Sequence, residues 1–137
     1  MDDSYMLHPI GVIRSDLTAL DAAPRQGYEG APDAWIEVFP PFEEALHRIG
    51  VEDELIILTW LHRSARDVLQ VHPRGEIENP LTGVFATRSP ARPNPIGLHR
   101  VTVLEITGVR LKVGPIEAID GTPVIDIKAV LSQMDDL

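Results

Sequence analysis

The sequence predicts an all-β fold, mainly antiparallel, with one short helix. Three observations predict it. The apolar segments are short and rich in β-branched residues, turn residues separate them, and only one segment has the apolar spacing of a helix. Many short strands of this kind form a small barrel or a sandwich rather than a doubly wound sheet, in which helices alternate with strands. We expect one domain over residues 1–137, because the chain has no internal repeat or low-complexity tract.

Two strands open the chain. Residues 5–13 (YMLHPIGVI) form the first predicted strand, in which Pro9 is tolerated near a sheet edge. Residues 35–39 (WIEVF) alternate between apolar and polar side chains, as a strand with one buried face does. Pro40 and Pro41 end this second strand, because proline lacks the N–H group that a strand ladder needs.

The single predicted helix comes next, followed by a buried strand. Residues 42–49 carry apolar side chains at helical spacing, Pro41 suits the first helical position, and Gly50 suits the end. Residues 54–61 (ELIILTWL) form a nearly continuous apolar run, which is typical of a strand that is buried on both faces.

The rest of the chain contains further short strands. The candidates are residues 68–71, 83–86, 96–106, 109–113 and 124–127. Thr107 and Gly108 form a tight connection between two of them, which is consistent with a hairpin. Asp120 and Gly121 are a second turn signal, shortly before the last strand.

Composition indicates a folded cytoplasmic protein without a membrane span, a disulfide or a metal. Hydrophobic residues make up 44% of the chain, and no apolar run approaches the roughly 18 residues that cross a bilayer. The first residues include acids where a secretory signal carries bases. The chain has no cysteine, and His62 and His72 lack the paired acids of a metal site. No Gly-rich loop lies between a strand and a helix, which excludes a phosphate loop and a dinucleotide fingerprint.

Charge is unevenly distributed along the chain. The formal net charge is −9, which argues against an extended nucleic-acid surface. Residues 62–100, however, contain six arginines and three acids, so this stretch carries +3 and the remainder −12. Guanidinium groups suit bidentate contacts with phosphate or carboxylate. We interpret the stretch as a local anion site, with a solvated loop as the alternative.

Residues 86–98 (ATRSPARPNPIGL) are the most unusual segment. Three prolines within six residues fix φ and exclude a helix or a central strand. A stiffened loop that presents Arg88, Ser89, Arg92 and Asn94 loses little conformational entropy when a ligand binds. A rigid crossover between two strands is the alternative, although a crossover does not need two arginines and an asparagine between its prolines.

Three further polar clusters are candidates for a site: Pro24-Arg25-Gln26, His62-Arg63 with Arg66, and Asp120-Gly121-Thr122. The first stands in an otherwise acidic region and, taken alone, reads as a surface loop. The second directly follows the predicted buried strand, where binding residues commonly lie. The third is a turn that offers backbone amides, a hydroxyl and a carboxylate to a polar ligand. Each cluster also has a plain structural interpretation, as a turn or an exposed loop.

Taken together, these segments resemble the TrmO (TsaA-like) family of tRNA N6-adenosine methyltransferases, which act on a threonylcarbamoyl-adenosine beside the anticodon. The matching motifs are residues 9–15 (PIGVIRS), residues 24–26 (PRQ), residues 83–98 (GVFATRSPARPNPIGL) and residues 120–128 (DGTPVIDIK). Their order and rough spacing fit the family, and the match spans nearly the whole chain. The motif at residues 83–98 is the most specific of the four.

The resemblance implies a single β-barrel that binds S-adenosylmethionine and forms a homodimer, with the cofactor near the subunit interface. By matching motif, the cofactor-binding residues are Pro24, Arg25, Gln26, His62, Arg63, Arg88, Leu98, Asp120, Gly121 and Thr122. We expect Arg66, Arg92 and Asn94 to contact the substrate, the anticodon loop of a tRNA. The acceptor nitrogen is a weak nucleophile, so a proton acceptor is needed, and the candidate catalytic residues are His62 and Asp126.

These residue types suit the cofactor. Arg25 or Arg88 would pair with its carboxylate, Asp120 would accept a hydrogen bond from the ribose or the amino group, and Leu98 would pack on the adenine. Methyl transfer needs mainly positioning of the two reactants, because the sulfonium is already a good leaving group.

The sequence departs from the family pattern in two places. Family members carry a proline and an aromatic residue after the last motif, where this chain has Ala129-Val130-Leu131. We also expect no separate C-terminal domain of the kind that longer members use to engage tRNA. Two alternatives therefore stay open: methylation of a small molecule or another acceptor by the same pocket, and a non-catalytic, regulatory S-adenosylmethionine-binding module.

Overall fold

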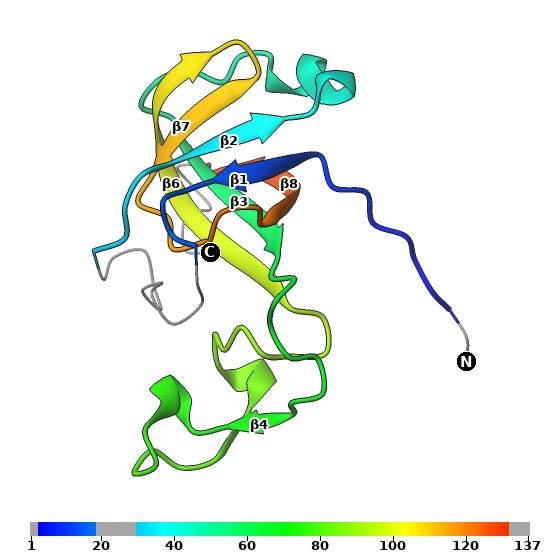
Figure 1. Ribbon diagram of the computed structural model, residues 1–137, viewed down its shortest axis with the longest axis vertical. Helices are drawn as coiled ribbons and strands as arrows, with labels where there is room; N and C mark the ends of the chain where they lie inside the picture. Colours follow the sequence, from blue (N-terminus) through cyan, green and yellow to red (C-terminus); the bar gives the residue numbers. More distant parts are fainter. Residues whose placement is uncertain (1–2, 19–29, 132–137) are drawn as a thin grey trace.

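Six strands close into an antiparallel barrel in the order β1-β2-β7-β6-β3-β8 (Figure 1). The structure, a computed structural model, describes residues 3–18 and 30–131. The barrel strands are β1 (Gly11–Arg14), β2 (Ala34–Val38), β3 (Glu54–Trp60), β6 (Ile96–Thr107), β7 (Arg110–Gly114) and β8 (Pro123–Ala129). The prediction of a mainly antiparallel β-barrel with one short helix is confirmed.

Alternating side chains along the strands fill the barrel. In β2 every second residue is buried, in agreement with its apolar–polar pattern. Thirteen of the described residues form the core cluster, and Ile13, Ile36, Ile57 and Val103 in it are fully buried. Burial of one such side chain contributes about 1.5–3 kcal/mol to folding. The core therefore keeps the barrel closed and holds the ends of its strands in fixed positions.

A 3-10 helix, η3 (Pro40–Leu46), lies where β2 ends and β6 turns into β7. The helix predicted over residues 42–49 therefore exists, but it begins earlier and is wound more tightly. Leu46 and Ile49 pack against the core, whereas Phe42 is 36% exposed. The helix ends at Leu46, because His47 has a non-helical ψ of 129° and Arg48 follows with a φ of +77°. Within residues 3–18 and 30–131, no helix has the length and apolar character that a membrane span requires.

Three connections meet at the opposite end of the barrel, which we call the site end. Strands β1, β3 and β7 end at this edge, and their antiparallel partners β2, β6 and β8 begin there. The three connections are therefore the β1–β2 segment (residues 15–33), the β3–β6 segment (residues 61–95) and the β7–β8 segment (residues 115–122). Strand pairing thus collects segments that are far apart in the sequence.

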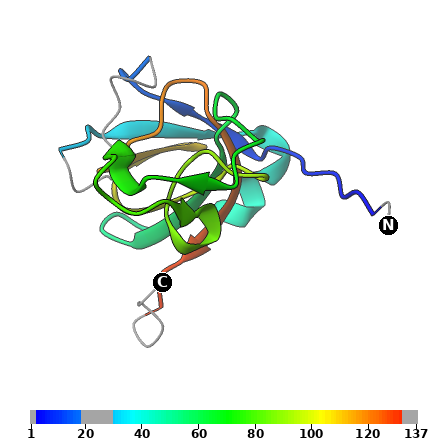
Figure 2. The ribbon, with the colours of Figure 1, turned by 90° about the horizontal axis from the view of Figure 1, so that it is seen from below.

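The β3–β6 connection forms a separate lobe, residues 61–95, below the barrel in Figure 1 and in front of it in Figure 2. Its elements are β4 (Gln70–Val71), η4 (Pro73–Gly75), β5 (Thr82–Gly83) and η5 (Val84–Ala86), and β4 pairs with β5. The strands predicted over residues 68–71 and 83–86 are thus only two residues long, and a 3-10 turn replaces most of the second. Three prolines after this turn prevent further pairing.

Candidate functional site

Most of the residues predicted for the cofactor site belong to connections at the site end. In the β3–β6 connection these residues are His62, Arg63 and Arg88. In the β7–β8 connection they are Asp120, Gly121 and Thr122. Pro24, Arg25 and Gln26 belong to the β1–β2 connection but lie outside the described residues. For the described residues, the barrel topology therefore brings to one end two connections whose predicted residues run from position 62 to position 122 in the sequence.

The turn before β8 is tied to the end of β1. Gly121 has φ +84°, a conformation that glycine adopts without strain. The amide of Asp120 donates to the carbonyl of Leu17 at 2.6 Å, and Oδ1 of Asp120 accepts from the amide of Ser15 at 3.1 Å. The buried hydroxyl of Thr122 donates to the carbonyl of Ile119 at 2.7 Å. The turn is thus preorganised, with the Asp120 carboxylate half-buried at its edge.

Arg63, which follows β3, contacts the stretch of main chain that comes directly after β1. Its Nη1 donates to the carbonyl oxygen of Thr18 at 3.3 Å. Thr18 follows Leu17, the residue that accepts the hydrogen bond from the Asp120 amide. The structure therefore brings Arg63 and Asp120 to one short stretch of main chain. His62, directly before Arg63, is exposed.

A groove of about 520 Å³ opens beside Asp120, where β1, β2 and β7 meet the site end. Arg14 and Lys112 supply cations to its lining, Asp33 and Asp120 supply carboxylates, and Trp35 supplies an aromatic face. Such a lining suits a ligand that carries charges of both signs next to a flat ring.

Leu98 and Asp126 lie away from this groove. Leu98 is paired with Leu58 on β3, and Leu58 is paired with Asp126 on β8, so the three form one row across the sheet. Gly97 and His99 are buried, and Leu98 therefore faces outward. The side chain of Asp126 is 52% exposed, and its Oδ2 lies 3.5 Å from Nζ of Lys128. Within one chain, the structure does not bring Leu98 or Asp126 into the groove.

The two predicted substrate-binding arginines, Arg66 and Arg92, hold the proline-rich loop in place. Nε of Arg66 donates to the carbonyl of Pro93 at 2.9 Å, and its Nη2 donates to Oδ1 of Asn94 at 3.4 Å. The Arg66 guanidinium also lies 5.0 Å from the ring centroid of Trp60. Nη2 of Arg92 donates to two carbonyls, those of residues 84 and 87, and its buried Nε has no hydrogen-bond partner among the described residues. The contacts of these residues with a substrate stay a prediction.

Arg88 differs from these two arginines. It is exposed just after η5, and none of the hydrogen bonds or ion pairs identified among the described residues involves it. Its neighbours hold the loop instead: the hydroxyl of Thr87 donates to the carbonyl of Val84 at 2.9 Å, and the Ser89 amide donates to the Thr87 hydroxyl at 3.1 Å. The loop thus presents a guanidinium group that is available for a ligand.

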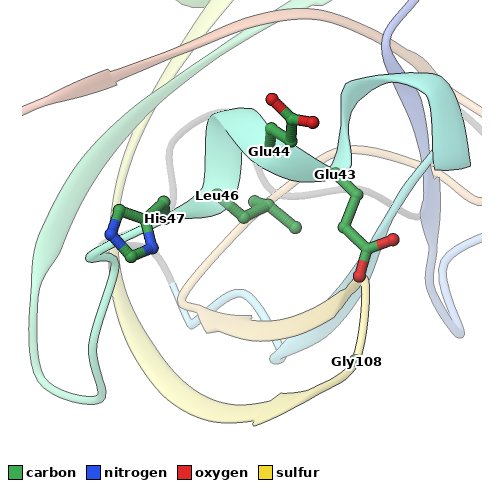
Figure 3. A pocket seen from close by; sticks show the side chains of 5 residues that line it. All are labelled: Glu43, Glu44, Leu46, His47 and Gly108. Atoms are coloured by element: carbon green, nitrogen blue, oxygen red, sulfur yellow. The ribbon is translucent and has the colours of Figure 1, made fainter.

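A second hollow, of about 450 Å³, lies at the other end of the barrel (Figure 3). Glu43, Glu44, Leu46 and His47 of η3 and its C-terminal flank line it together with Gly108 of the β6–β7 turn. None of the predicted site residues that the structure describes lines this hollow. Among residues 3–18 and 30–131, no group of three or more His, Asp or Glu side chains is arranged to hold a metal ion.

One buried polar cluster was not predicted from the sequence. Oγ1 of Thr59 lies 2.8 Å from Nε2 of His99, and Nδ1 of His99 lies 2.6 Å from Oε1 of Glu117. Thr59 and His99 are inside the barrel, with 0% and 4% exposure. Both are polar residues at inward-facing positions, where their strands otherwise carry glycine or apolar residues, and that pattern is the signal that the sequence offers for them.

Comparisons with known proteins are consistent with this fold. The family model described as tRNA-methyltransferase O N-terminal domain matches residues 12–136. A protein of Archaeoglobus fulgidus named S-adenosyl-L-methionine-binding protein is 45% identical over 130 residues, which cover 95% of this chain and 92% of that protein. The tRNA (adenine(37)-N6)-methyltransferase of Escherichia coli is 36% identical over 143 residues, which cover 98% of this chain and 61% of that protein.

Solved structures give the same result. A crystal structure of TrmO from Pseudomonas aeruginosa superposes with a TM-score of 0.79 and 32% identity, and the match covers 100% of this chain and 59% of that chain. This chain therefore spans less than two thirds of the TrmO proteins, but nearly all of the archaeal relative. The resemblance expected from the sequence motifs is confirmed, and the chain belongs to the tRNA-methyltransferase O N-terminal domain family.

Proposed function

We propose that the protein is an S-adenosylmethionine-dependent methyltransferase that N6-methylates a threonylcarbamoyl-adenosine next to the anticodon of a tRNA. One observation carries the proposal: Arg63 and the Asp120 turn meet at one end of the barrel, beside a groove lined by charges of both signs. Family membership and the names of the relatives confirm the cofactor that the sequence predicted.

The groups at the site end fit this cofactor. S-adenosylmethionine carries a carboxylate, an ammonium, a ribose and an adenine. Arg63 and Arg88 provide guanidinium groups for the carboxylate, and Asp120 provides an acceptor for the ammonium or the ribose. The amides of Asp120, Gly121 and Thr122 donate to the carbonyls of Leu17, Ile13 and Ile119, so they keep Asp120 in place rather than bind the ligand themselves.

The reaction needs positioning more than acid–base power. Bound S-adenosylmethionine supplies an electrophilic methyl group on a good leaving group. The protein has to hold the acceptor nitrogen in line with that group and exclude competing geometries. The turn at Asp120 is fixed by several hydrogen bonds, which suits this task. His62, exposed beside Arg63, is the better placed of the two candidate proton acceptors, since Asp126 lies on the outer wall near Lys128.

The lobe is the proposed contact region for RNA. Residues 61–95 contain five arginines and three acids and therefore carry +2 on a chain of net charge −9, and arginine suits phosphate contacts. Arg88 projects from the lobe, and Arg66 and Asn94 lie together at the proline-rich loop. A positive lobe on an acidic barrel would direct the RNA toward the site end.

We also propose a homodimer as the functional unit. Leu98 lies on the outer wall of one chain, away from the groove that Asp120 lines. Contact between Leu98 and the cofactor therefore needs a second chain whose wall faces the groove. Exposed apolar side chains on the lobe, Ile77 and Phe85 among them, favour association. Light scattering coupled to size exclusion tests this point directly.

The test of the proposed activity uses tRNA from cells that lack the N6-methylation. The protein is incubated with this tRNA and S-adenosylmethionine carrying a deuterated methyl group, and the nucleosides are then separated by mass spectrometry. We expect the deuterated methyl group on threonylcarbamoyl-adenosine only. tRNA without the threonylcarbamoyl group is the matched control and should stay unlabelled. Absence of label from both samples contradicts the tRNA proposal.

A second candidate function is S-adenosylmethionine binding with another acceptor or with none. It is favoured by the name of the archaeal relative, which mentions binding and no reaction, and by the acidic barrel. Binding of the cofactor without retention of tRNA at low salt points to another acceptor. Binding without methyl transfer to any fraction of a cell extract points to a regulatory module.

A further inference from the structure

A chain of three side chains crosses the interior of the barrel near the site end. Thr59 on β3 contacts Nε2 of His99 on β6, and Nδ1 of His99 contacts Glu117 in the β7–β8 connection. A carboxylate oxygen can only accept, so Nδ1–H of His99 donates to Glu117, and Nε2 forms the second hydrogen bond of the ring, with the Thr59 hydroxyl. The imidazole is thus held at both of its nitrogens.

The His99 ring is buried and closely surrounded. The side chain of His99 is 3% exposed and that of Glu117 is 17% exposed. A Cβ added at Gly97 would lie 2.8 Å from Nε2 of His99 and closer still to Oγ1 of Thr59, so only glycine fits there. Buried polar groups that satisfy one another in this way define a unique arrangement.

The hydrogen bonds of Thr59, His99 and Glu117 connect the two parts of the proposed cofactor site, which are the start of the lobe and the turn at Asp120. Thr59 lies three residues before His62, where the lobe begins, and Glu117 lies three residues before Asp120. The main-chain hydrogen bonds of the β7–β8 connection tie it to β1 and to Pro32, on one side of the site end. The bond from His99 to Glu117 ties the same connection to β6, on the other side.

We propose that His99 is a positioning residue for the cofactor site, because it fixes the β7–β8 connection, and with it Asp120, relative to the lobe. This inference rests on the proposed function. His99 acts through Glu117 and Asp120 and touches no reacting atom.

The test compares His99→Leu, Glu117→Ala and Glu117→Gln with the wild type. His99→Leu and Glu117→Ala remove the bond between β6 and the connection, whereas Glu117→Gln keeps an oxygen that accepts from Nδ1–H. By calorimetry, we expect the first two variants to bind S-adenosylmethionine roughly tenfold more weakly, as the loss of one charge-assisted contact implies. Glu117→Gln should bind within about twofold of the wild type, since its hydrogen bond persists.

A readout without ligand accompanies the affinities. Hydrogen exchange of the Asp120 and Gly121 amides, which donate to Leu17 and Ile13, reports how firmly the turn is held. We expect faster exchange at these two amides in His99→Leu and in Glu117→Ala, and wild-type exchange in Glu117→Gln.

Val103→Ala controls for general loss of stability. Val103 is fully buried and lies further along β6, toward η3 and away from the site end. Val103→Ala should lower the melting temperature. It should leave the affinity for S-adenosylmethionine and the hydrogen exchange of the Asp120 and Gly121 amides unchanged. If His99→Leu does not fold, Glu117→Ala, which removes the same bond from a partly exposed residue, decides the question.

The possible results distinguish a failure of the inference about His99 from a failure of the proposed function. Wild-type affinity and wild-type exchange in both bond-deleting variants overturn the role of His99. Equal weakening in Val103→Ala overturns it as well, because the effect would then be one of stability. A wild type that does not bind S-adenosylmethionine contradicts the proposed function, while hydrogen exchange still shows whether His99 fixes the turn.

Discussion

The barrel and the lobe are stabilised in different ways. The barrel has a continuous apolar core of thirteen described residues and an unbroken circle of strand pairs. In the lobe, two strands of two residues pair, and within residues 61–95, all of which the structure describes, only Val84 and Pro95 are buried. The barrel is therefore held together by burial of apolar surface, and the lobe is not.

Polar contacts of single side chains stabilise the lobe instead. Arg92 donates to two carbonyls, Arg66 joins Pro93 to Asn94, and the His72 ring contacts the carbonyl of Asn79 at 2.8 Å. Each contact contributes little by itself, and the loss of one affects its whole neighbourhood. A region of this kind opens locally more easily than a core and suits the binding of a large ligand.

The largest expected effect comes from the barrel. Ile57→Ala empties space inside the core, where Ile57 is fully buried. We expect it to lower the free energy of unfolding by about 2–5 kcal/mol, as similar truncations do. Urea denaturation followed by circular dichroism measures the change. A loss below about 1 kcal/mol would mean that the barrel is not the main source of stability.

The second effect concerns the cofactor. Arg88 is exposed, and none of the hydrogen bonds or ion pairs identified among the described residues involves it, so Arg88→Ala should leave stability unchanged. It should weaken S-adenosylmethionine binding by about 1.5–3 kcal/mol, as calorimetry would measure, because a charge-assisted contact is lost. Arg48→Ala, which removes an exposed cation after η3 at the other end of the barrel, separates this loss from a general effect of charge. Unchanged affinity in Arg88→Ala would show that Arg88 does not contact the cofactor.

A smaller, local effect is expected inside the lobe. Arg92→Ala removes the two hydrogen bonds that join η5 to the proline-rich loop. Hydrogen exchange should show that the amides of residues 82–92 open more easily, by about 1.5 kcal/mol, while the barrel amides keep their protection. Arg88→Ala is the matched control in the same loop. Equal loss of protection in the barrel would mean that lobe and barrel unfold as one unit.

The smallest effect is expected on the barrel surface. Oε2 of Glu54 lies 2.7 Å from Nη2 of Arg100, and both side chains are at least 40% exposed. Glu54→Gln should change the free energy of unfolding by less than about 1 kcal/mol, because solvent and salt screen such pairs. Denaturation at low and high salt measures it. A larger, salt-independent loss would place this pair among the main stabilising contacts.

The difference between the barrel and the lobe also explains which parts of the fold could be predicted from the sequence. Strands with a core face, such as residues 35–39 and 54–61, were predicted nearly to their ends, because burial imposes a period on the side chains. The strand predicted over residues 5–13 is wrong for residues 5–10, because β1 begins only at Gly11 and Tyr5, Met6 and Leu7 are exposed. The lobe strands and the winding of η3 were also predicted less well, because there the prolines and individual polar contacts decide the local structure. Regular packing leaves a pattern in the sequence, and individual polar contacts do not.

The candidate site divides in a similar way. The motifs around Arg63 and Asp120 were identifiable from residue types, and strand pairing brought them together. The contact between Thr59 and His99 joins residues 40 positions apart, and its partner Glu117 comes from a third segment. Pairing of this kind depends on register, which a single sequence does not specify.

The central claim is that S-adenosylmethionine binds at the site end of the barrel. Titration of the isotope-labelled protein with this cofactor, followed by backbone amide chemical shifts, tests the claim directly. We predict the largest shifts at Arg63, Arg88 and Asp120–Thr122, with little change at Glu43, His47 and Gly108 at the other end. Shifts concentrated at η3 and the β6–β7 turn, with none at Asp120, would contradict the account.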